Sequence, residues 1–125
     1  MTATPPMTTG ASSTTFRRGD VLLVPFPFSD LSSAKTRPAV VVSSPEYHRT
    51  EPDLLLAAIT SQVAQATGPC DYVLTYWRRA GLRFPSALKP VLFTLDPSRV
   101  LHRIGAVAPD DLTQIDHRLC FALGL

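Results

Sequence analysis

Two short segments of this sequence carry the side chains best suited to binding a phosphate group. The first, KTRP, supplies Lys35 and Arg37, and the second, ITSQ, supplies Thr60, Ser61 and Gln62. A guanidinium presents a planar fork of donors that matches two phosphate oxygens, and a hydroxyl can add a further hydrogen bond. A molecule that contains phosphate is therefore the leading ligand class for this chain.

An arginine and a threonine beside one phosphodiester are enough to cleave RNA without a metal ion. RNA supplies its own nucleophile, because the neighbouring 2′-OH attacks the phosphorus and the protein need only position groups and stabilise charge. This interpretation requires the strands that carry Arg37 and Thr60 to converge. The residue pattern equally allows a structural role, in which Arg37 pairs with Asp20 or Asp30 and Thr60 only satisfies a turn.

Other kinds of catalytic or metal site find little support in the sequence. His117 and Cys120 supply only two of the four ligands that a structural zinc needs. The adjacent Asp110 and Asp111 suit a helix N-terminus better than a magnesium site. No serine stands in a GxSxG motif, and no glycine-rich phosphate loop occurs. The sequence therefore predicts neither a metal nor another cofactor.

Short strands are expected to hold both of these segments. Residues 20–26 and 38–43 are apolar and β-branched, and residues 27–36 between them are turn-rich, which predicts a strand, a loop and a second strand. Residues 54–60, LLLAAIT, form an apolar run typical of a buried strand. Both reactive groups are thus predicted to lie at strand ends.

Three further strands and three helical or turn segments complete the predicted fold. The strands are residues 71–75, 86–95 and 99–104, and the other segments are a short helix between Ser44 and Pro52, a turn or short helix at residues 76–81, and a C-terminal helix that begins at Pro109. Pro90 should push its strand toward a sheet edge or a bulge. Gly124 sits where the last helix would end. The predicted fold is mainly β, a small barrel of mostly antiparallel strands with a C-terminal helix.

Composition and length indicate a single domain. The 125 residues suit one domain, and the 12 prolines favour short strands over long helices. Residues 1–15 lack hydrophobic periodicity, which predicts a disordered N-terminal tail before a domain at residues 16–125. Cys70 and Cys120 have no CxxC spacing and are expected to be reduced core residues. Neither a secretory signal nor a bilayer-length apolar run is recognisable, so a cytoplasmic protein is expected.

The charges are unevenly distributed along the chain. The net charge is only +2, but residues 71–103 contain six cations and two acids. This segment can form a basic face, or its arginines can simply solvate the surface. Tyr76, Trp77 and Arg78 are candidates for stacking on unpaired bases, although a lone tryptophan is more often a core or interface residue.

Four sequence stretches together resemble the MazF/PemK family of toxins from toxin-antitoxin systems. They are GDVLLVPFPFSD, KTRPAVVVSS, AAITSQ and LFTLDPSRVLHRIGAV, and the similarity covers nearly everything from Arg18 to Leu125 in the family's order. The combination is much more specific than any one stretch. The resemblance implies a small SH3-like or CcdB-like barrel that dimerises.

By the same resemblance, the chain is expected to be a sequence-specific, metal-independent endoribonuclease that cleaves single-stranded RNA, whether messenger, transfer or ribosomal. The family's catalytic arginine falls on Arg37 and its catalytic threonine on Thr60. The residues expected to bind RNA are Lys35, Ser29, Ser61, Gln62, Arg78 and Arg79, and residues 29–35 would form a mobile loop over the substrate groove. Because a guanidinium releases its proton reluctantly, we expect Arg37 to stabilise transition-state charge.

The resemblance also implies partners and leaves two alternatives. A symmetric homodimer and a cognate antitoxin with an acidic, flexible tail are expected, and the basic middle of the chain is compatible with that tail. The first alternative is a toxin of the same fold that binds and poisons a protein such as DNA gyrase without cleaving RNA. The second is a small barrel that binds nucleic acid or a peptide without turnover.

Overall fold

A computed structural model describes residues 15–26 and 35–125 of the chain. The predicted disordered tail and most of the predicted loop, including Ser29, therefore lie outside the described residues, apart from Thr15 at the end of the tail and Lys35 and Thr36 at the end of the loop. Within the described part, no helix is both long enough and apolar enough to cross a membrane.

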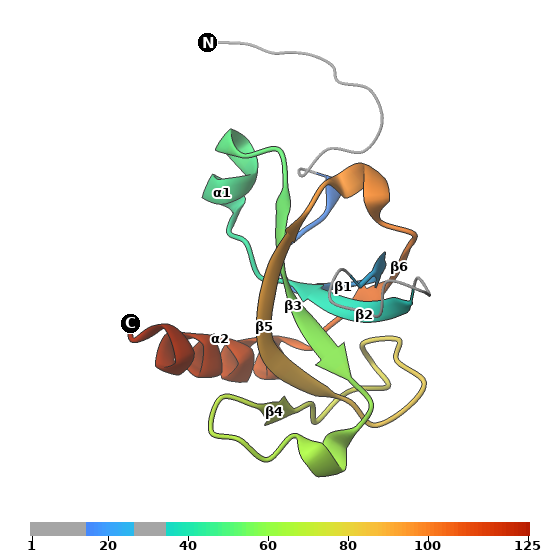
Figure 1. The fold of residues 1–125 in the computed structure, drawn as a ribbon, viewed down its shortest axis with the longest axis vertical. Helices are drawn as coiled ribbons and strands as arrows, with labels where there is room; N and C mark the ends of the chain where they lie inside the picture. The colour runs from blue at the N-terminus through green and yellow to red at the C-terminus, as the bar shows by residue number, and fades with distance from the viewer. Residues whose placement is uncertain (1–14, 27–34) are drawn as a thin grey trace.

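The described strands form one curled antiparallel sheet in the order β4-β5-β3-β2-β1-β6 (Figure 1). The strands are β1 (Asp20–Pro25), β2 (Thr36–Val41), β3 (Leu54–Thr60), β4 (Tyr72–Val73), β5 (Ala87–Leu95) and β6 (His102–Ala106). In Figure 1, β3 and β5 run side by side through the middle of the molecule, and α1 and β4 lie toward opposite ends. The predicted fold class is confirmed, with the sheet curled into a half-barrel.

Two helices flank the sheet close to their predicted positions. The short α1 (Pro45–Thr50) begins where the Ser44 hydroxyl accepts the Tyr47 N–H at 3.1 Å, and proline occupies its first turn. The C-terminal α2 (Pro109–Leu123) carries two aspartates in its first turn and ends at Gly124, which has φ +75°. Local capping chemistry therefore accounts for the start of α1 and for the C-terminal end of α2, whereas no side chain caps the start of α2 at Ala108.

Pro90 lies in a bulge, one of the two positions predicted for it. Ala57 of β3 pairs with Leu92, but Ile59 pairs with Leu88, so β5 holds two more residues than β3 between these pairs. Proline has no N–H to donate to a ladder, and a bulge removes that requirement. β5 lies between β3 and β4, but β4 pairs only with Ala87 and Leu88, so no described β4 residue pairs with Pro90.

The strand predicted at residues 38–43 is observed two residues earlier, as β2 (Thr36–Val41). Two further strands also differ from those predicted, and these two share a cause. The strand expected at residues 99–104 begins later, because Pro97–Arg99 form a 3₁₀ turn in which the Ser98 N–H donates to the Asp96 carboxylate at 2.9 Å. The strand expected at residues 71–75 shortens to Tyr72–Val73, because the N–H of Thr75 bonds to the side chain of Asp111. Both differences arise from a carboxylate that competes with the sheet for backbone donors.

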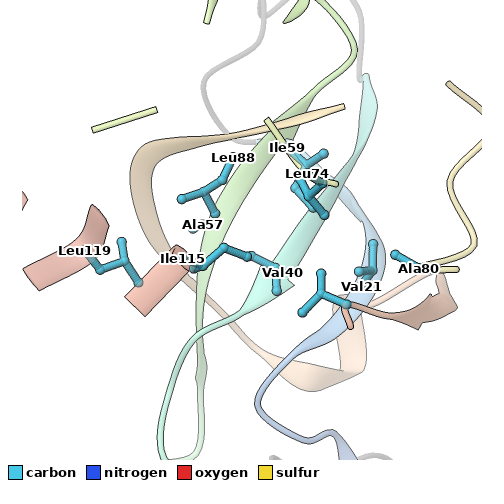
Figure 2. Close-up of a cluster of buried hydrophobic side chains, with 10 residues drawn as sticks. Val21, Val40, Ala57, Ile59, Leu74, Ala80, Leu88, Ile115 and Leu119 are labelled. Carbon is cyan, nitrogen blue, oxygen red and sulfur yellow. The ribbon is translucent and has the colours of Figure 1, made fainter. Parts of the chain in front are cut away.

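Two hydrophobic cores lie on the two faces of the sheet. The helix-side core, drawn in Figure 2, contains Val21, Val40, Ala57, Ile59, Leu74, Ala80, Leu88, Val107, Ile115 and Leu119. The second core contains Leu22, Val24, Ala39, Val41, Leu54, Leu56, Phe93 and Leu95. Successive residues of β1, β2 and β3 alternate between the two cores, as the period of a strand requires.

Both cysteines are free thiols. Cys70 is half-buried and Cys120 is exposed, so the prediction that they are core residues is wrong. Cys120 follows the buried Leu119 and is carried by the helical period to the solvent side of α2.

Candidate active site

The ends of β2 and β3 bring Arg37 and Thr60 opposite one another. The two strands are antiparallel, with Ala39 paired to Ala58, and the same register continued for two residues places Arg37 across from Thr60. The convergence that the sequence interpretation required is therefore present in the fold.

The ladder between these strands stops before the two side chains are reached. Val42 donates its N–H to Leu55 at 2.9 Å, so the alternation of β2 also directs the nitrogen of Pro38 toward β3. Proline has no hydrogen there to donate, and the last pair between the strands is Ala39 with Ala58. Pro38 thus leaves the ends of the strands outside the ladder, beside Arg37.

Strand alternation turns Arg37 and Thr60 toward the same face of the sheet. Arg37 shares its face with Ala39, and Thr60 shares its face with Leu56, and both neighbours belong to the second core. Phe26 packs against this core, and the centre of its ring lies 5.8 Å from Arg37 Cζ. The exposed guanidinium therefore rests beside an aromatic ring, which favours a cation.

Two clefts meet at this point. The Thr60 cleft, of about 350 Å³, is lined by Phe26, Arg37, Ala58, Ile59, Thr60, Gln62, Gln65, Lys89 and Val91. The Phe84 cleft, of about 500 Å³, is lined by Leu23, Thr36, Arg37, Pro38, Ile59, Ser61, Gly81, Leu82, Arg83, Phe84, Ser86, His102 and Ile104. Arg37 and Ile59 line both clefts, so the guanidinium lies on the border between them.

The described lining of the two clefts is basic and contains no carboxylate. Arg37, Arg83 and Lys89 contribute the positive charge. Lys89 is partly neutralised, because its ammonium lies 2.8 Å from the buried carboxylate of Asp71. Burial raises the pKa of Asp71, but Lys89 and the Gly68 N–H together hold it below its ordinary value. The surface suits an anion.

The structural alternative for Arg37 can be tested for one of its two proposed partners. Asp20 accepts from Arg103 Nη2 at 3.0 Å and from the Arg17 N–H at 2.9 Å, so its pairing with Arg37 is wrong. Asp30 lies outside the described residues. Among the residues that the structure describes, Arg37 takes part in no ion pair.

The Thr60 hydroxyl stabilises the turn, as the sequence allowed, and it can still donate a hydrogen bond to a ligand. Its Oγ1 accepts the N–H of Gln62 at 3.1 Å. A hydroxyl that accepts one hydrogen bond still has its own hydrogen to donate. Thr60 is half-buried at the cleft, so the turn fixes its oxygen where a phosphate oxygen could accept from it.

The residues predicted to bind RNA divide between the clefts and the outer surface. Gln62 lines the Thr60 cleft and Ser61 lines the Phe84 cleft. Lys35 is exposed just before β2, and neither cleft includes it. Arg78 and Arg79 are exposed and line neither cleft. The structure thus brings two of these residues to Arg37 and leaves three outside the clefts.

The residues Tyr76, Trp77 and Arg78 line neither cleft. Arg78 Cζ lies 4.9 Å from the centre of the Trp77 ring, and Trp77 is half-buried against the helix-side core. Tyr76 is exposed. Trp77 thus packs partly against the core, which is compatible with the core or interface role that the sequence allowed.

The sequence interpretation missed Arg83, Phe84 and His102 as cleft residues. Arg83 and Phe84 are neighbours in the segment LRFP, where an arginine beside an aromatic residue is a recognisable pattern for binding nucleic acid. His102 lies on β6, far away in the sequence, so its position depends on the fold. In the described part of the chain, no three His, Cys, Asp or Glu side chains gather where they could hold a metal.

Comparisons with known proteins identify the family and the fold. A family model described as the PemK-like, MazF-like toxin of type II toxin-antitoxin systems matches residues 17–123. A mycobacterial endoribonuclease, solved in complex with its cognate antitoxin, has a TM-score of 0.70 and 20% identity over 87% of this chain and 95% of its own.

Two structures from Deinococcus radiodurans are similar to the same extent. Its MazF has a TM-score of 0.65 and 22% identity over 87% of this chain and 96% of its own. Its MazE–MazF complex has a TM-score of 0.68 and 21% identity over 87% and 96%. At these identities, the likeness shows a shared fold.

Proposed function

Because the chain belongs to the PemK-like, MazF-like toxins of type II toxin-antitoxin systems, we propose that it is a sequence-specific endoribonuclease acting on single-stranded RNA. One observation carries the proposal. Arg37 and Thr60, at the ends of β2 and β3, line the same cleft, and the described lining of that cleft contains no carboxylate. The solved relatives that are named endoribonucleases share this fold and give further support.

The proposed reaction exchanges one phosphorus–oxygen bond for another. The 2′-oxygen forms a bond to phosphorus, and the bond from phosphorus to the 5′-oxygen breaks. The products are a 2′,3′-cyclic phosphate and a free 5′-hydroxyl. The 2′-OH loses a proton and the 5′-oxygen gains one, so that atoms and charge balance without water or a metal ion.

The two catalytic residues act on the charge that develops at phosphorus. Arg37 donates two hydrogen bonds to the non-bridging oxygens, whose negative charge increases in the transition state. Thr60, held by Gln62, donates its hydroxyl hydrogen to one of the same oxygens. A guanidinium releases a proton too reluctantly to serve well as an acid, so its contribution is electrostatic.

The test is an incubation of the purified protein with a long RNA in EDTA, followed by mapping of the fragment ends. We expect discrete cuts at a short motif, ending in 2′,3′-cyclic phosphates and 5′-hydroxyls. A protein that binds RNA or another protein without producing fragments would contradict the proposal and favour one of the non-catalytic alternatives. Cuts that require added metal would contradict the metal-independent route.

The proposal includes partners and an assembly. The related structures with an antitoxin support a cognate acidic antitoxin that covers the basic clefts. We also propose a homodimer of a single domain at residues 16–125 that acts on RNA in the cytoplasm. Sedimentation at micromolar concentration should give the mass of two chains, and a monomer would contradict the dimer.

A further inference from the structure

The position of Arg37 on the border of two clefts determines where the neighbouring nucleotides of a bound RNA must lie. Arg37 and Ile59 line both clefts, and among the described residues no other is common to the two linings. A phosphate held by Arg37 therefore has one cleft on each side of it. Because a phosphodiester joins two nucleosides, a strand that crosses Arg37 places one nucleoside at each cleft.

Phe84 is an unusual surface residue in the larger of these clefts. Its side chain is 64% exposed, although large apolar side chains are normally buried. Its backbone is nevertheless held firmly: the buried Ser86 hydroxyl donates to the Phe84 carbonyl at 2.7 Å, and the Leu74 N–H donates to the Ser86 carbonyl at 2.9 Å. An exposed ring on a backbone held in this way is suited to stacking on an unpaired base.

The chain segment before Phe84 packs directly against β6. Gly81 has φ +89°, and a Cβ there would lie 2.6 Å from the Ile104 carbonyl oxygen. A Cβ on Gly105 would lie 2.3 Å from the Ala80 carbonyl oxygen. Residues 80–81 and 104–105 therefore touch backbone to backbone, which joins the Phe84 segment to β6 and fixes the width of the cleft.

The remaining lining fits the mixed chemistry of a nucleotide. Leu23, Leu82 and Ile104 supply apolar surface, while Arg83 and His102 supply hydrogen-bond donors. The described lining of this cleft contains no acid. A base needs an apolar face, polar partners at its edge and a positive neighbour for its phosphate, and the cleft offers all three.

We propose that the Phe84 cleft binds the unpaired base of a nucleotide adjoining the phosphate held by Arg37, with the base stacked on Phe84 and its edge bonded to Arg83 and His102. This inference rests on the proposed ribonuclease function and adds to it the side chains that read one position of the cut motif.

The experiment pairs each variant with a matched control elsewhere on the surface. Phe84→Ala is compared with Phe121→Ala, because Phe121 is 66% exposed on α2 and lines neither cleft. Arg83→Met is compared with Arg99→Met, since both arginines are exposed and Arg99 lines neither cleft. Cut sites are mapped on an RNA library randomised around the wild-type motif. Binding is measured with an oligonucleotide of the wild-type motif that carries 2′-deoxyribose at the cut site.

We expect Phe84→Ala to weaken binding of this oligonucleotide by about tenfold or more and to remove base preference at one position beside the cut. Arg83→Met should relax the same position. Phe84→Trp, which keeps a stacking ring, should retain the preference. The two control variants should cut the same motif as the wild type.

The outcomes separate this inference from the function on which it rests. A wild-type protein that cuts no RNA contradicts the proposed function. A wild-type protein that cuts RNA, together with a Phe84→Ala variant of unchanged base preference, overturns the inference alone. A change in sedimentation or antitoxin binding without a change in base preference also overturns it, because Phe84 would then be a protein contact. Thermal unfolding of Phe84→Leu verifies that the fold survives loss of the ring.

Discussion

At the scale of single residues, the clearest prediction concerns the planar fork of Arg37. Arg37→Lys keeps the charge beside the Phe26 ring but cannot donate two parallel hydrogen bonds to phosphate. We expect the single-turnover cleavage rate to fall by about 100-fold while RNA affinity changes much less. The Arg99→Lys variant, outside both clefts, is the control. A lysine variant of nearly normal rate would show that bidentate contact is not what Arg37 provides.

Thr60 gives a second residue-scale prediction, because its turn role and its proposed catalytic role use the same oxygen. Thr60→Ser keeps the hydroxyl that accepts from Gln62, whereas Thr60→Ala removes it. The alanine variant should lose about 100-fold in the chemical step and the serine variant should lose little. Single-turnover rates at saturating RNA, measured beside affinity for the 2′-deoxy oligonucleotide, test this. Equal single-turnover rates for Thr60→Ala and Thr60→Ser would show that the hydroxyl serves only the turn and has no catalytic role.

The placement of Arg37 and Thr60, the two proposed catalytic residues, at strand ends could be predicted from the sequence because each lies at the end of a strongly patterned strand. The run at residues 54–60 became β3 with the same bounds, and the valines after Pro38 continued β2. Arg83, Phe84 and His102 were not found, because their approach to Arg37 depends on how β6 and the segment before β5 pack. Arg78 and Arg79 were predicted to bind RNA from their charge alone, and the charge of a residue does not determine the direction in which its side chain points.

At the scale of elements, α1 is tied to the sheet through a buried histidine. His48 Nε2 lies within hydrogen-bond distance of the buried Ser43 hydroxyl, which also accepts the Leu55 N–H of β3 at 3.1 Å. Burial lowers the pKa of His48 below its ordinary value of 6.5. The folded state therefore favours the neutral ring, and the unfolded state binds the proton more readily.

The resulting prediction is a loss of stability as the pH falls below about 6.5. The contribution of His48 is fully present above that value and decreases toward the lower pKa of the folded state. The lowered pKa of Asp71 acts in the same direction only below about pH 3.8, so the two contributions are separable. Urea midpoints at pH 8 and pH 5.5 should differ in the wild type and in His117→Gln, and much less in His48→Gln.

A second element-scale prediction concerns the buried carboxylate at the start of α2. Asp111 is fully buried and accepts from the Tyr72 hydroxyl at 2.6 Å, the Thr75 N–H at 3.0 Å and the Tyr76 N–H at 2.8 Å. Burial, followed by the bond to Asp111, raises the pKa of Tyr72. One carboxylate thus joins α2 to β4 and to the turn after it.

Asp111→Asn replaces one acceptor oxygen with an amide donor, which removes the acceptor of at least one of the three part-buried hydrogen bonds and buries an amide donor without a partner. We expect a loss of about 2–4 kcal/mol in the free energy of unfolding. The exposed neighbour Asp110 provides a matched control, and Asp110→Asn should change stability only slightly. Similar urea unfolding curves for the two variants would contradict the stabilising role of the Asp111 hydrogen bonds between α2, β4 and the turn after it. The helix start was predictable from its two aspartates, but a bond between residues 72 and 111 has no local signal.

At the scale of the whole molecule, the fold class followed from patterning and the two faces of the sheet followed from alternation. What the sequence could not provide was the curl that brings residues 80–81 against β6. That approach depends on the two glycines that lack a side chain at the contact, and glycine in a sequence looks the same in a turn as in a packing site.

A whole-molecule prediction follows for Gly105, whose added Cβ would lie 2.3 Å from the Ala80 carbonyl oxygen. Because the atom in the way is a backbone oxygen, which cannot rotate aside, Gly105→Ala should lower the free energy of unfolding by about 2 kcal/mol or more. It should also displace the segment that carries Phe84. Gly124→Ala is the control, since nothing lies within 4 Å of a Cβ at that helix end. Its cost should be near 1 kcal/mol, from the left-handed backbone alone. An equal loss of stability in both variants, measured by urea unfolding, would show that the contact is not tight.

The position of Arg37 between two clefts has a kinetic consequence for the proposed enzyme. One guanidinium would hold the reacting phosphate and also mark the border of the site that reads the adjoining base. An RNA with the wrong base would still be bound through its other phosphates, but its reacting phosphate would be displaced from the Arg37 guanidinium. Discrimination would then appear mainly in kcat at saturating RNA, and incorrect RNAs would act as competitive inhibitors more readily than as substrates.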